Sequence, residues 1–292
     1  MVARGHILHR IRALRNFGDV RKGDLGGYIE HGSNLSHEGN CWIYNDAEVY
    51  GRAKIGGDAK IRDHAKVHGH AEVYDKAKIY GYAEVFGYMR VHGSASVYGY
   101  AEASSDTRRE KRGEICDEAC VFGDAKIRGA ARVHGNARIY GFAEISGRAE
   151  LFGYVVVYGS AKICDSAKVL QSAEISGKAK ISGRAKIYGN AKVQDTANVY
   201  GNARIYGFAK VLDNANVYGR SRVYGAACVF GSANIYGEAI VKGHAVICGS
   251  ALVHGHTVIS GSALVHGHTV ISGDTKINGT NQAHQLLASQ AQ

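Results

Sequence analysis

The sequence contains no proline, two methionines and a single tryptophan among its 292 residues. Proline is the residue that lacks a backbone N–H, so its absence leaves donors throughout the chain, which suits a continuous β-ladder. No apolar run reaches membrane-spanning length, and the opening MVARGHILHRIRALRN has basic residues but no apolar segment typical of a signal peptide. We therefore expect a soluble, cytoplasmic protein that does not bind membranes.

Cysteine is scarce, and its spacing does not match a zinc ribbon. CDEAC at 116–120 is a weak match to any metal motif, so we expect free thiols, no metal site and a reducing compartment. The six cysteines are Cys41, Cys116, Cys120, Cys164, Cys228 and Cys248. The net charge of +10 permits contact with nucleic acid, acidic glycans or other anions but does not choose among them.

Glycine and tyrosine, with 39 and 18 residues, are abundant and follow a period of six. From Ile43 to Ile277 every sixth residue is Ile, Val or Leu, except Ala103 and Arg109. The repeated unit reads (Val/Ile)-(Tyr/His)-Gly-x-Ala-(Lys/Glu), as in IYGNAK at 187–192. A period of six fits neither an α-helix nor a hairpin, and it is typical of a parallel β-solenoid.

Each hexapeptide predicts a short strand followed by a turn. In AKIY, Ala185 and Ile187 point to one face of the strand, and Lys186 and Tyr188 point to the other. Gly189 can take the positive φ that bends the chain at a corner. Three hexapeptides per coil then place each residue beside the one eighteen positions later, which predicts an all-β, triangular, single-stranded parallel β-helix.

The hexapeptides resemble those of the hexapeptide-repeat superfamily, whose coils are left-handed and whose members include CoA-dependent acyltransferases. A more specific resemblance lies in LHRIRALRNFGDVRKGDLGGYIEHGSNLSHEGNCWIYNDAEVYG, residues 8–51, which is similar to the opening of the YdcK-like proteins of bacteria and phages. Those proteins are assigned as transferases from their fold. The resemblance implies a left-handed parallel β-helix, an acyl-CoA cofactor if the chain is an enzyme, and a trimer with a general base in the cleft between adjacent copies.

The repeat departs from the superfamily pattern directly after the aliphatic residue. Tyr, His or Phe commonly stands there, and Gly comes one position later than usual. The outer faces are therefore more aromatic, and no site residues can be transferred from known acyltransferases.

The period also predicts the domain organisation. Residues 1–42 break it and form an N-terminal cap whose apolar side chains plug the first coil, and residues 43–280 form the β-helix. Residues 281–292 form a C-terminal tail, either a short helix or a disordered segment. The polar stretch 104–114 is either an irregular coil face or an extruded, solvated loop, and the aliphatic register resumes at Ile115.

Stacking by eighteen turns outward residues into columns. A candidate binding surface combines a basic column with a neighbouring tyrosine column, suited to a phosphate backbone or an acidic glycan. The basic column is Lys168, Lys186, Arg204 and Arg222, and the tyrosine column is Tyr188, Tyr206 and Tyr224. The asparagine column is Asn198, Asn216 and Asn234, which we interpret as structural because stacked amides stabilise in-register parallel strands.

Histidine supplies the candidates for the general base of an acyltransferase, although we favour surface histidines in a repetitive position. These are His64, His68, His70, His92, His134, His244 and the pairs at 254/256 and 266/268. The last two pairs belong to the doubled dodecapeptide SALVHGHTVISG, but twelve residues are two thirds of a coil, so the copies form no histidine column.

The outward position before each core aliphatic residue becomes apolar in the last coils. This set, called here the apolar collar, is Ile240, Val246, Leu252, Val258, Leu264 and Val270. An exposed apolar surface of this kind predicts a covering partner, such as the tail or a neighbouring subunit of a homo-oligomer.

No catalytic residues, phosphate loop or metal-ligand pattern can be assembled from local spacing. We therefore expect a β-solenoid scaffold or interaction protein with no cofactor. The alternatives are a trimeric CoA-dependent acyltransferase using acetyl-CoA or another acyl-CoA, and a binder of nucleic acid or acidic glycan.

Overall fold

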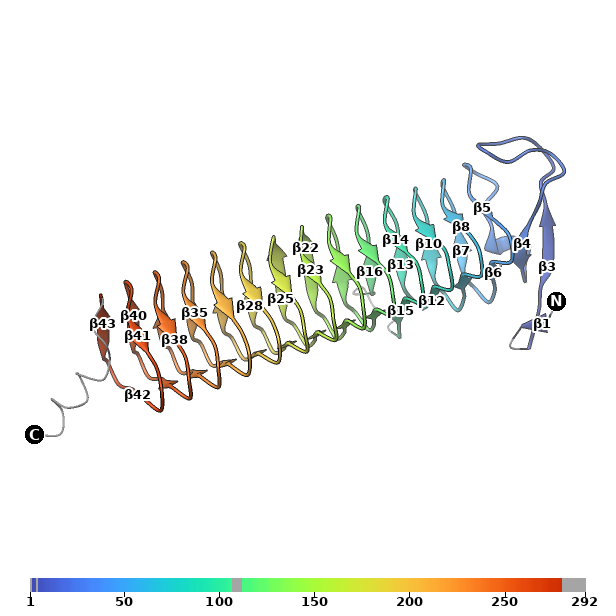
Figure 1. The fold of residues 1–292 in the computed structure, drawn as a ribbon. Coiled ribbons are helices and arrows are strands. Elements are labelled where there is room, and N and C mark those ends of the chain that lie inside the picture. The colour runs from blue at the N-terminus through green and yellow to red at the C-terminus, as the bar shows by residue number, and fades with distance from the viewer. Residues whose placement is uncertain (1, 4, 107–111, 280–292) are drawn as a thin grey trace, which may run out of the picture. The chain divides into compact units, whose positions relative to one another are not determined.

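The computed structural model describes residues 2–3, 5–106 and 112–279, which fall into two compact units, residues 1–148 and 149–292. Nearly every regular element is a β-strand of two to five residues (Figure 1). Across the described ranges, one 3₁₀-helix occurs, η1 (Gly32–Asn34), and no helix is long and apolar enough to cross a membrane. The tail predicted at 281–292 lies outside the described residues.

Unit 1 contains three sheets of short strands, all parallel except for the β3–β4 pair, and an N-terminal hairpin of β1 (Val2–Ala3) and β2 (His6–Ile7). The first sheet is β5 (Trp42–Ile43), β8 (Lys60–Ile61), β11 (Lys78–Ile79), β14 (Ser96–Val97), β17 (Cys120–Val121) and β20 (Arg138–Ile139). The second is β7 (Lys54–Ile55), β10 (Glu72–Val73), β13 (Arg90–Val91), β16 (Glu114–Ile115) and β19 (Arg132–Val133). The third is β3 (His9–Arg12), β4 (Leu25–Ile29), β6 (Glu48–Val49), β9 (Lys66–Val67), β12 (Glu84–Gly87), β15 (Glu102–Ser105), β18 (Lys126–Ile127) and β21 (Glu144–Ile145).

Unit 2 repeats the same three-sheet arrangement. Its first sheet is β23 (Val156–Val157), β26 (Glu174–Ile175), β29 (Lys192–Val193), β32 (Lys210–Val211), β35 (Cys228–Val229), β38 (Val246–Ile247) and β41 (Leu264–Val265). Its second is β22 (Glu150–Gly153), β25 (Lys168–Gln171), β28 (Lys186–Ile187), β31 (Arg204–Ile205), β34 (Arg222–Val223), β37 (Ile240–Val241), β40 (Val258–Ser260) and β43 (Lys276–Asn278). Its third is β24 (Lys162–Ile163), β27 (Lys180–Ile181), β30 (Asn198–Val199), β33 (Asn216–Val217), β36 (Asn234–Ile235), β39 (Leu252–Val253) and β42 (Val270–Ile271).

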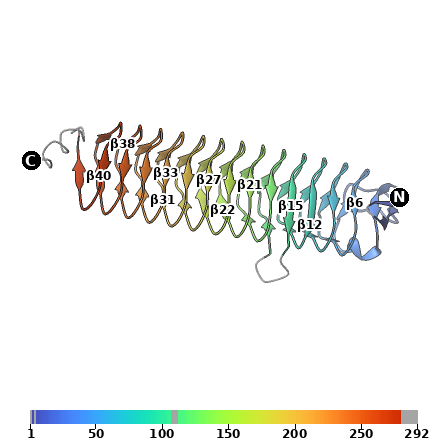
Figure 2. The ribbon, with the colours of Figure 1, turned by 90° about the horizontal axis from the view of Figure 1, so that it is seen from below.

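The coil is built as the period predicts. Ile187 and Ala185 are fully buried, whereas Lys186 is exposed and Tyr188 is half-buried on the outside. Gly189 turns the corner at φ 74°. Hydrogen bonds run from coil to coil, as from the Lys186 N–H to the Ala203 carbonyl at 2.9 Å. Within each unit the coils stack in this way (Figure 2), and the predicted all-β parallel solenoid with three hexapeptides per coil is confirmed.

One coil of unit 1 is longer than eighteen residues. Arg90 pairs with Glu114, and Ala103 with Ile127, each twenty-four positions apart. The coil therefore holds six residues beyond the period, and this favours an extra segment over an irregular coil face for the stretch 104–114. Arg109, which the period counts as a core position, lies outside the described residues.

The chain before residue 42 breaks the period but joins the solenoid of unit 1. β4 pairs antiparallel with β3 and parallel with β6, so it covers the open edge of that sheet. The apolar plug is less complete than expected, because Ile7, Leu14 and Leu25 are 63%, 82% and 54% exposed. The domain boundary at residue 42 stays a prediction.

Candidate functional site

The basic column lies along the second sheet of unit 2, at the outward position of four successive strands. Lys168 pairs with Lys186, Lys186 with Arg204, and Arg204 with Arg222. This alignment follows from the parallel register of β25, β28, β31 and β34. Their core residues are aligned from strand to strand, so the residues that precede them are aligned too. The last three side chains of the column are exposed.

The charges of this column are only partly balanced. Lys168 forms an ion pair with Glu150, one coil earlier. Within the described part of unit 2, no carboxylate lies within 4.0 Å of the charged groups of Lys186, Arg204 or Arg222. Two unit charges one strand spacing apart, about 4.8 Å, repel by about 0.9 kcal/mol in water. Binding of an anion would reduce this repulsion among the three cations.

The tyrosine column is a stack of parallel rings beside these cations. The ring centroids of Tyr188 and Tyr206 lie 4.8 Å apart and those of Tyr206 and Tyr224 lie 4.6 Å apart, with interplanar angles of 2° and 5°. Burial raises the pKa of Tyr206, as do its two ring neighbours to a lesser extent, so its hydroxyl stays neutral. Each inner ring face is covered by the next ring. The column therefore offers ring edges and hydroxyl groups to a ligand, not open faces on which nucleobases could stack.

The asparagine column is tied together by its own amides. Asn198, Asn216 and Asn234 pair in register, and the Asn198 Nδ2 donates to the Asn216 Oδ1 at 3.2 Å. The same Nδ2 also donates to the Thr196 carbonyl at 3.1 Å. These bonds occupy the amides within the coil, which agrees with a structural role.

The apolar collar occupies outward positions on all three sheets of unit 2. Its members pair in register as Ile240 with Val258, Val246 with Leu264, and Leu252 with Val270. Five of the six side chains are half-buried, while Val270 is 45% exposed. Each side chain thus shields part of its neighbour and leaves the rest open to water.

At least five of the ten histidines proposed as candidate bases stack on an aromatic ring. The His68 ring lies between Tyr50 and Phe86, at centroid distances of 4.7 and 5.0 Å, and its Nε2 is 2.8 Å from the Glu84 Oε1. His254 stacks on Tyr236 at 4.8 Å. This packing matches the interpretation of histidine as a repetitive surface residue.

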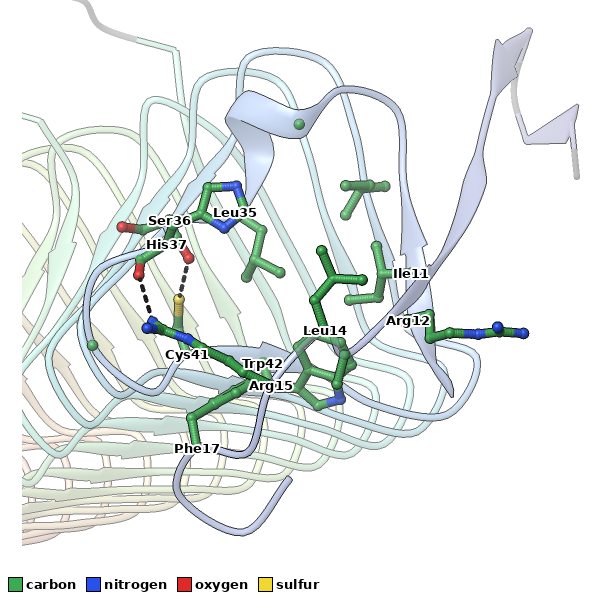
Figure 3. A pocket seen from close by; sticks show the side chains of 14 residues that line it. Ile11, Arg12, Leu14, Arg15, Phe17, Leu35, Ser36, His37, Cys41 and Trp42 are labelled. Carbon is green, nitrogen blue, oxygen red and sulfur yellow. Dashed lines mark hydrogen bonds between the residues drawn. The ribbon is translucent and has the colours of Figure 1, made fainter. Parts of the chain in front are cut away.

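An apolar cavity of about 480 Å³ opens among the N-terminal residues of unit 1 (Figure 3). Ile11, Leu14, Phe17, Leu35 and Trp42 contribute to its lining. The cavity has no counterpart in the sequence analysis, since it forms between segments that lie outside the repeat.

Two groups of potential metal ligands share Cys116, and the expectation of no metal site stays a prediction. The first adds His92 and Glu114, and the second adds Asp117 and His134. The histidines belong to the coils on either side of the thiol, so no local motif could reveal either group. All six cysteines are free thiols.

Comparison with known proteins gives a limited match. No protein-family model matches the chain. A stretch of 43 residues is 42% identical to a protein named uncharacterized acetyltransferase YdcK from Escherichia coli strain K12, and it covers 15% of this chain and 13% of that protein. The chain is thus a three-sheet parallel β-solenoid of the hexapeptide-repeat type, with a distant and partial similarity to that acetyltransferase.

Proposed function

We propose that the chain is a non-catalytic β-solenoid interaction protein and that the second sheet of unit 2 binds an acidic polysaccharide. The observation that carries the proposal is the row of Lys186, Arg204 and Arg222, aligned strand by strand without carboxylate partners among the described residues. A polymer with regularly spaced carboxylate or sulfate groups can contact several of these cations at once. The tyrosine hydroxyls beside them can hydrogen-bond to sugar hydroxyls.

An acidic polysaccharide suits this surface better than a single-stranded nucleic acid. Both would use the charge, but the nucleic acid gains much of its affinity from bases stacked on open aromatic faces. The rings of Tyr188, Tyr206 and Tyr224 cover one another at 4.6–4.8 Å, so that contribution is small here.

The test compares two charge-matched triple variants of the full chain. One neutralises the column (Lys186→Gln, Arg204→Gln, Arg222→Gln), and the control carries Lys→Gln at the exposed residues 162, 180 and 210, on the other two sheets of unit 2. Fluorescence anisotropy with labelled heparin oligosaccharide and with labelled oligothymidylate measures binding at several salt concentrations.

We expect the column variant to lose heparin affinity about tenfold or more, because each exposed ion pair contributes about 0.5–1 kcal/mol, and the control to lose about twofold. Wild-type binding weakens as salt rises because screening reduces the attraction. Equal losses in the two variants would refute the column as the site. Tighter binding of oligothymidylate than of heparin would show that the column binds nucleic acid and not an acidic polysaccharide.

A second candidate function is acyl transfer from an acyl-CoA, and the match to the named acetyltransferase favours it. In hexapeptide-repeat enzymes the reaction needs a cleft between adjacent copies, so this candidate requires a trimer. Acetyl-CoA should then raise the melting temperature of the chain, and light scattering should give the mass of three copies. A strict monomer without a thermal shift would rule it out.

A further inference from the structure

One column of unit 1 places a thiol between two imidazoles. The residues that follow the core positions of β10, β13, β16 and β19 are Tyr74, His92, Cys116 and His134. Cys116 is 5% exposed and stands one coil away from each histidine. The Cys116 Sγ is 3.6 Å from the His134 Nδ1.

A carboxylate on the same strand reaches one of these histidines. The Glu114 Oε1 is 2.9 Å from the His92 Nε2, and the Glu114 Oε2 accepts a hydrogen bond from the Arg132 Nη2 at 2.9 Å. The Glu114 side chain is 19% exposed. One ligand atom each from His92, Glu114 and Cys116 thus lies within 4.8 Å of the others.

Thiolate, imidazole and carboxylate are the ligand types of zinc, with bond lengths of about 2.3, 2.0 and 2.1 Å. Around a tetrahedral ion, two such ligand atoms stand about 3.5 Å apart. From separations within 4.8 Å, the ligand atoms would have to shift by about an ångström to reach this spacing. The backbone ladder of β13 and β16 can stay in place.

Residues outside the three ligands already hold the ring of His92 in its orientation. Its ring stacks on Tyr74 at a centroid distance of 4.8 Å and an interplanar angle of 3°. Its second nitrogen, Nδ1, faces the Asp75 Oδ2 at 3.8 Å, and the same oxygen accepts from the Gly93 N–H at 3.1 Å. Histidine ligands of metals commonly have a carboxylate behind the second nitrogen, which fixes the tautomer and the ring plane.

We propose that His92, Glu114 and Cys116 form a zinc-binding site, with the fourth position open to water. On binding, the thiol releases its proton to solvent as the sulfur–zinc bond forms, and nothing is oxidised or reduced. His92 binds through Nε2, which gives up the proton that it donates to Glu114 in the metal-free chain, while Nδ1, facing Asp75, takes one up, so that only the thiol loses a proton overall. The thiolate and the carboxylate balance the two positive charges of the ion. This site is separate from the proposed polysaccharide surface.

The surroundings of the thiol keep it protonated until a metal binds. Burial, and then the negative charges of Asp117 and Glu114, raise the pKa of Cys116 to about 12, while Arg132 acts in the opposite direction. Without a metal the thiol is neutral at physiological pH and a poor nucleophile. The same carboxylates attract a divalent cation, and the cation in turn stabilises the thiolate.

The second ligand group competes for the same sulfur but is less suited to an ion. It consists of Cys116, Asp117 and His134. Asp117 is exposed, and its Oδ2 already accepts from the Gly135 N–H at 2.8 Å, which stabilises its corner. The first group instead draws its carboxylate from Glu114, which is half-buried.

Cobalt is the probe, because a cobalt–thiolate bond gives a charge-transfer absorption that zinc lacks. The full chain is freed of metal with a chelator, kept reduced and titrated with CoCl₂. The variants are Cys116→Ser, His92→Gln, Glu114→Gln, Asp75→Asn and His134→Gln. A matched thiol control is Cys120→Ser, since the half-buried Cys120 lies outside both ligand groups and donates to the Glu118 carbonyl at 3.6 Å.

We expect one cobalt ion per chain with a thiolate band, and stoichiometric displacement by zinc. The band disappears in Cys116→Ser and persists in Cys120→Ser and His134→Gln. Cobalt affinity falls at least tenfold in His92→Gln and Glu114→Gln. It falls about tenfold in Asp75→Asn, as is usual when the residue behind a metal-binding histidine is replaced.

Two results would overturn the proposal. One is wild-type protein without a thiolate band at saturating cobalt. The other is a band lost in His134→Gln and retained in His92→Gln, which assigns the ion to the second group. Circular dichroism checks the fold of every variant. If Cys116→Ser does not fold, the test is the cobalt affinity of His92→Gln, since His92 is only half-buried. An unchanged affinity in that variant would reject the site.

Discussion

Substitutions of Asp213 test what stabilises the corners of the coils. This residue turns the chain at φ 56°, where L residues are rare, and its Oδ2 accepts a hydrogen bond from the Gly231 N–H at 2.9 Å. Asp63, Asp117 and Asp165 repeat both features, each accepting from the N–H eighteen residues later at 2.8–2.9 Å. Among the described residues, six of the eight non-glycine residues at positive φ are aspartates.

The two contributions can be separated by three variants at one position. Asp213→Ala keeps a Cβ in the left-handed region without a polar side chain, which costs about 1–2 kcal/mol, and it removes the acceptor. The lost bond costs about 1 kcal/mol, because the freed N–H can turn to water at this exposed corner. Asp213→Gly relieves the strain and loses only the acceptor, about 1 kcal/mol in total. Asp213→Asn retains an acceptor oxygen and tolerates the conformation, so its cost is within about 0.5 kcal/mol.

Urea unfolding followed by far-ultraviolet circular dichroism measures the free energy of unfolding of each variant. We expect the alanine variant to be the most destabilised, then the glycine variant, then the asparagine variant. The control is Asp124→Ala, which removes the same charge from an exposed position outside the positive-φ residues. Its effect should stay within about 0.5 kcal/mol. A glycine variant as unstable as the alanine variant would show that the backbone conformation contributes nothing, and the reasoning would fail.

Three further predictions follow from packing and charge. We propose that the apolar collar joins two copies of the chain, so that Leu252→Lys combined with Leu264→Lys lowers the mass in light scattering, and an unchanged mass would contradict this. Ile205→Ala, at a fully buried position, should lower the free energy of unfolding by about 2–5 kcal/mol in urea titrations, and a loss below 1 kcal/mol would mean that the coil collapses around the cavity. Lys60 lowers the pKa of Asp19 from 3.8 to about 2, so the stability that Asp19 adds is complete above about pH 4 and is lost as pH falls toward 2. Asp19→Asn should therefore lower the melting temperature at pH 7 but not at pH 2, and an equal difference at both values would refute the assignment.

The repeated part of the fold could be predicted residue by residue because its determinants are local. One aliphatic residue and one small residue define each strand and corner, as Ile187 and Ala191 do, and both are fully buried. The coil length of eighteen then assigns every column, including the rows of Lys186 and Tyr188. Side-chain orientation within a column could not be predicted in the same way, since the coverage of one tyrosine ring by the next depends on rotamers.

The exceptions Ala103 and Arg109 and the polar stretch 104–114 marked an interruption, but the sequence could not decide between an irregular coil face and an extra segment. An insertion of six residues equals one repeat, so the aliphatic phase is the same before it, at Val97, and after it, at Ile115. The structure reveals it through the pairing of Val91 with Ile115. The ligand group around Cys116 was missed for the same reason, because His92 becomes its neighbour only when this longer coil is counted.

Departures from the period are therefore the places where selection for something other than the coil can be recognised. The repeat normally has a lysine or a glutamate at the outward position, and the coil forms equally well with either residue. A buried thiol beside an imidazole adds nothing to the hydrogen-bond ladder, and neither does an outward leucine such as Leu252, which exposes apolar surface to water. The solenoid core explains Ile187 or Val211 fully, but it explains neither Cys116 nor Leu252. For their placement we propose an ion for the first and a covering surface for the second.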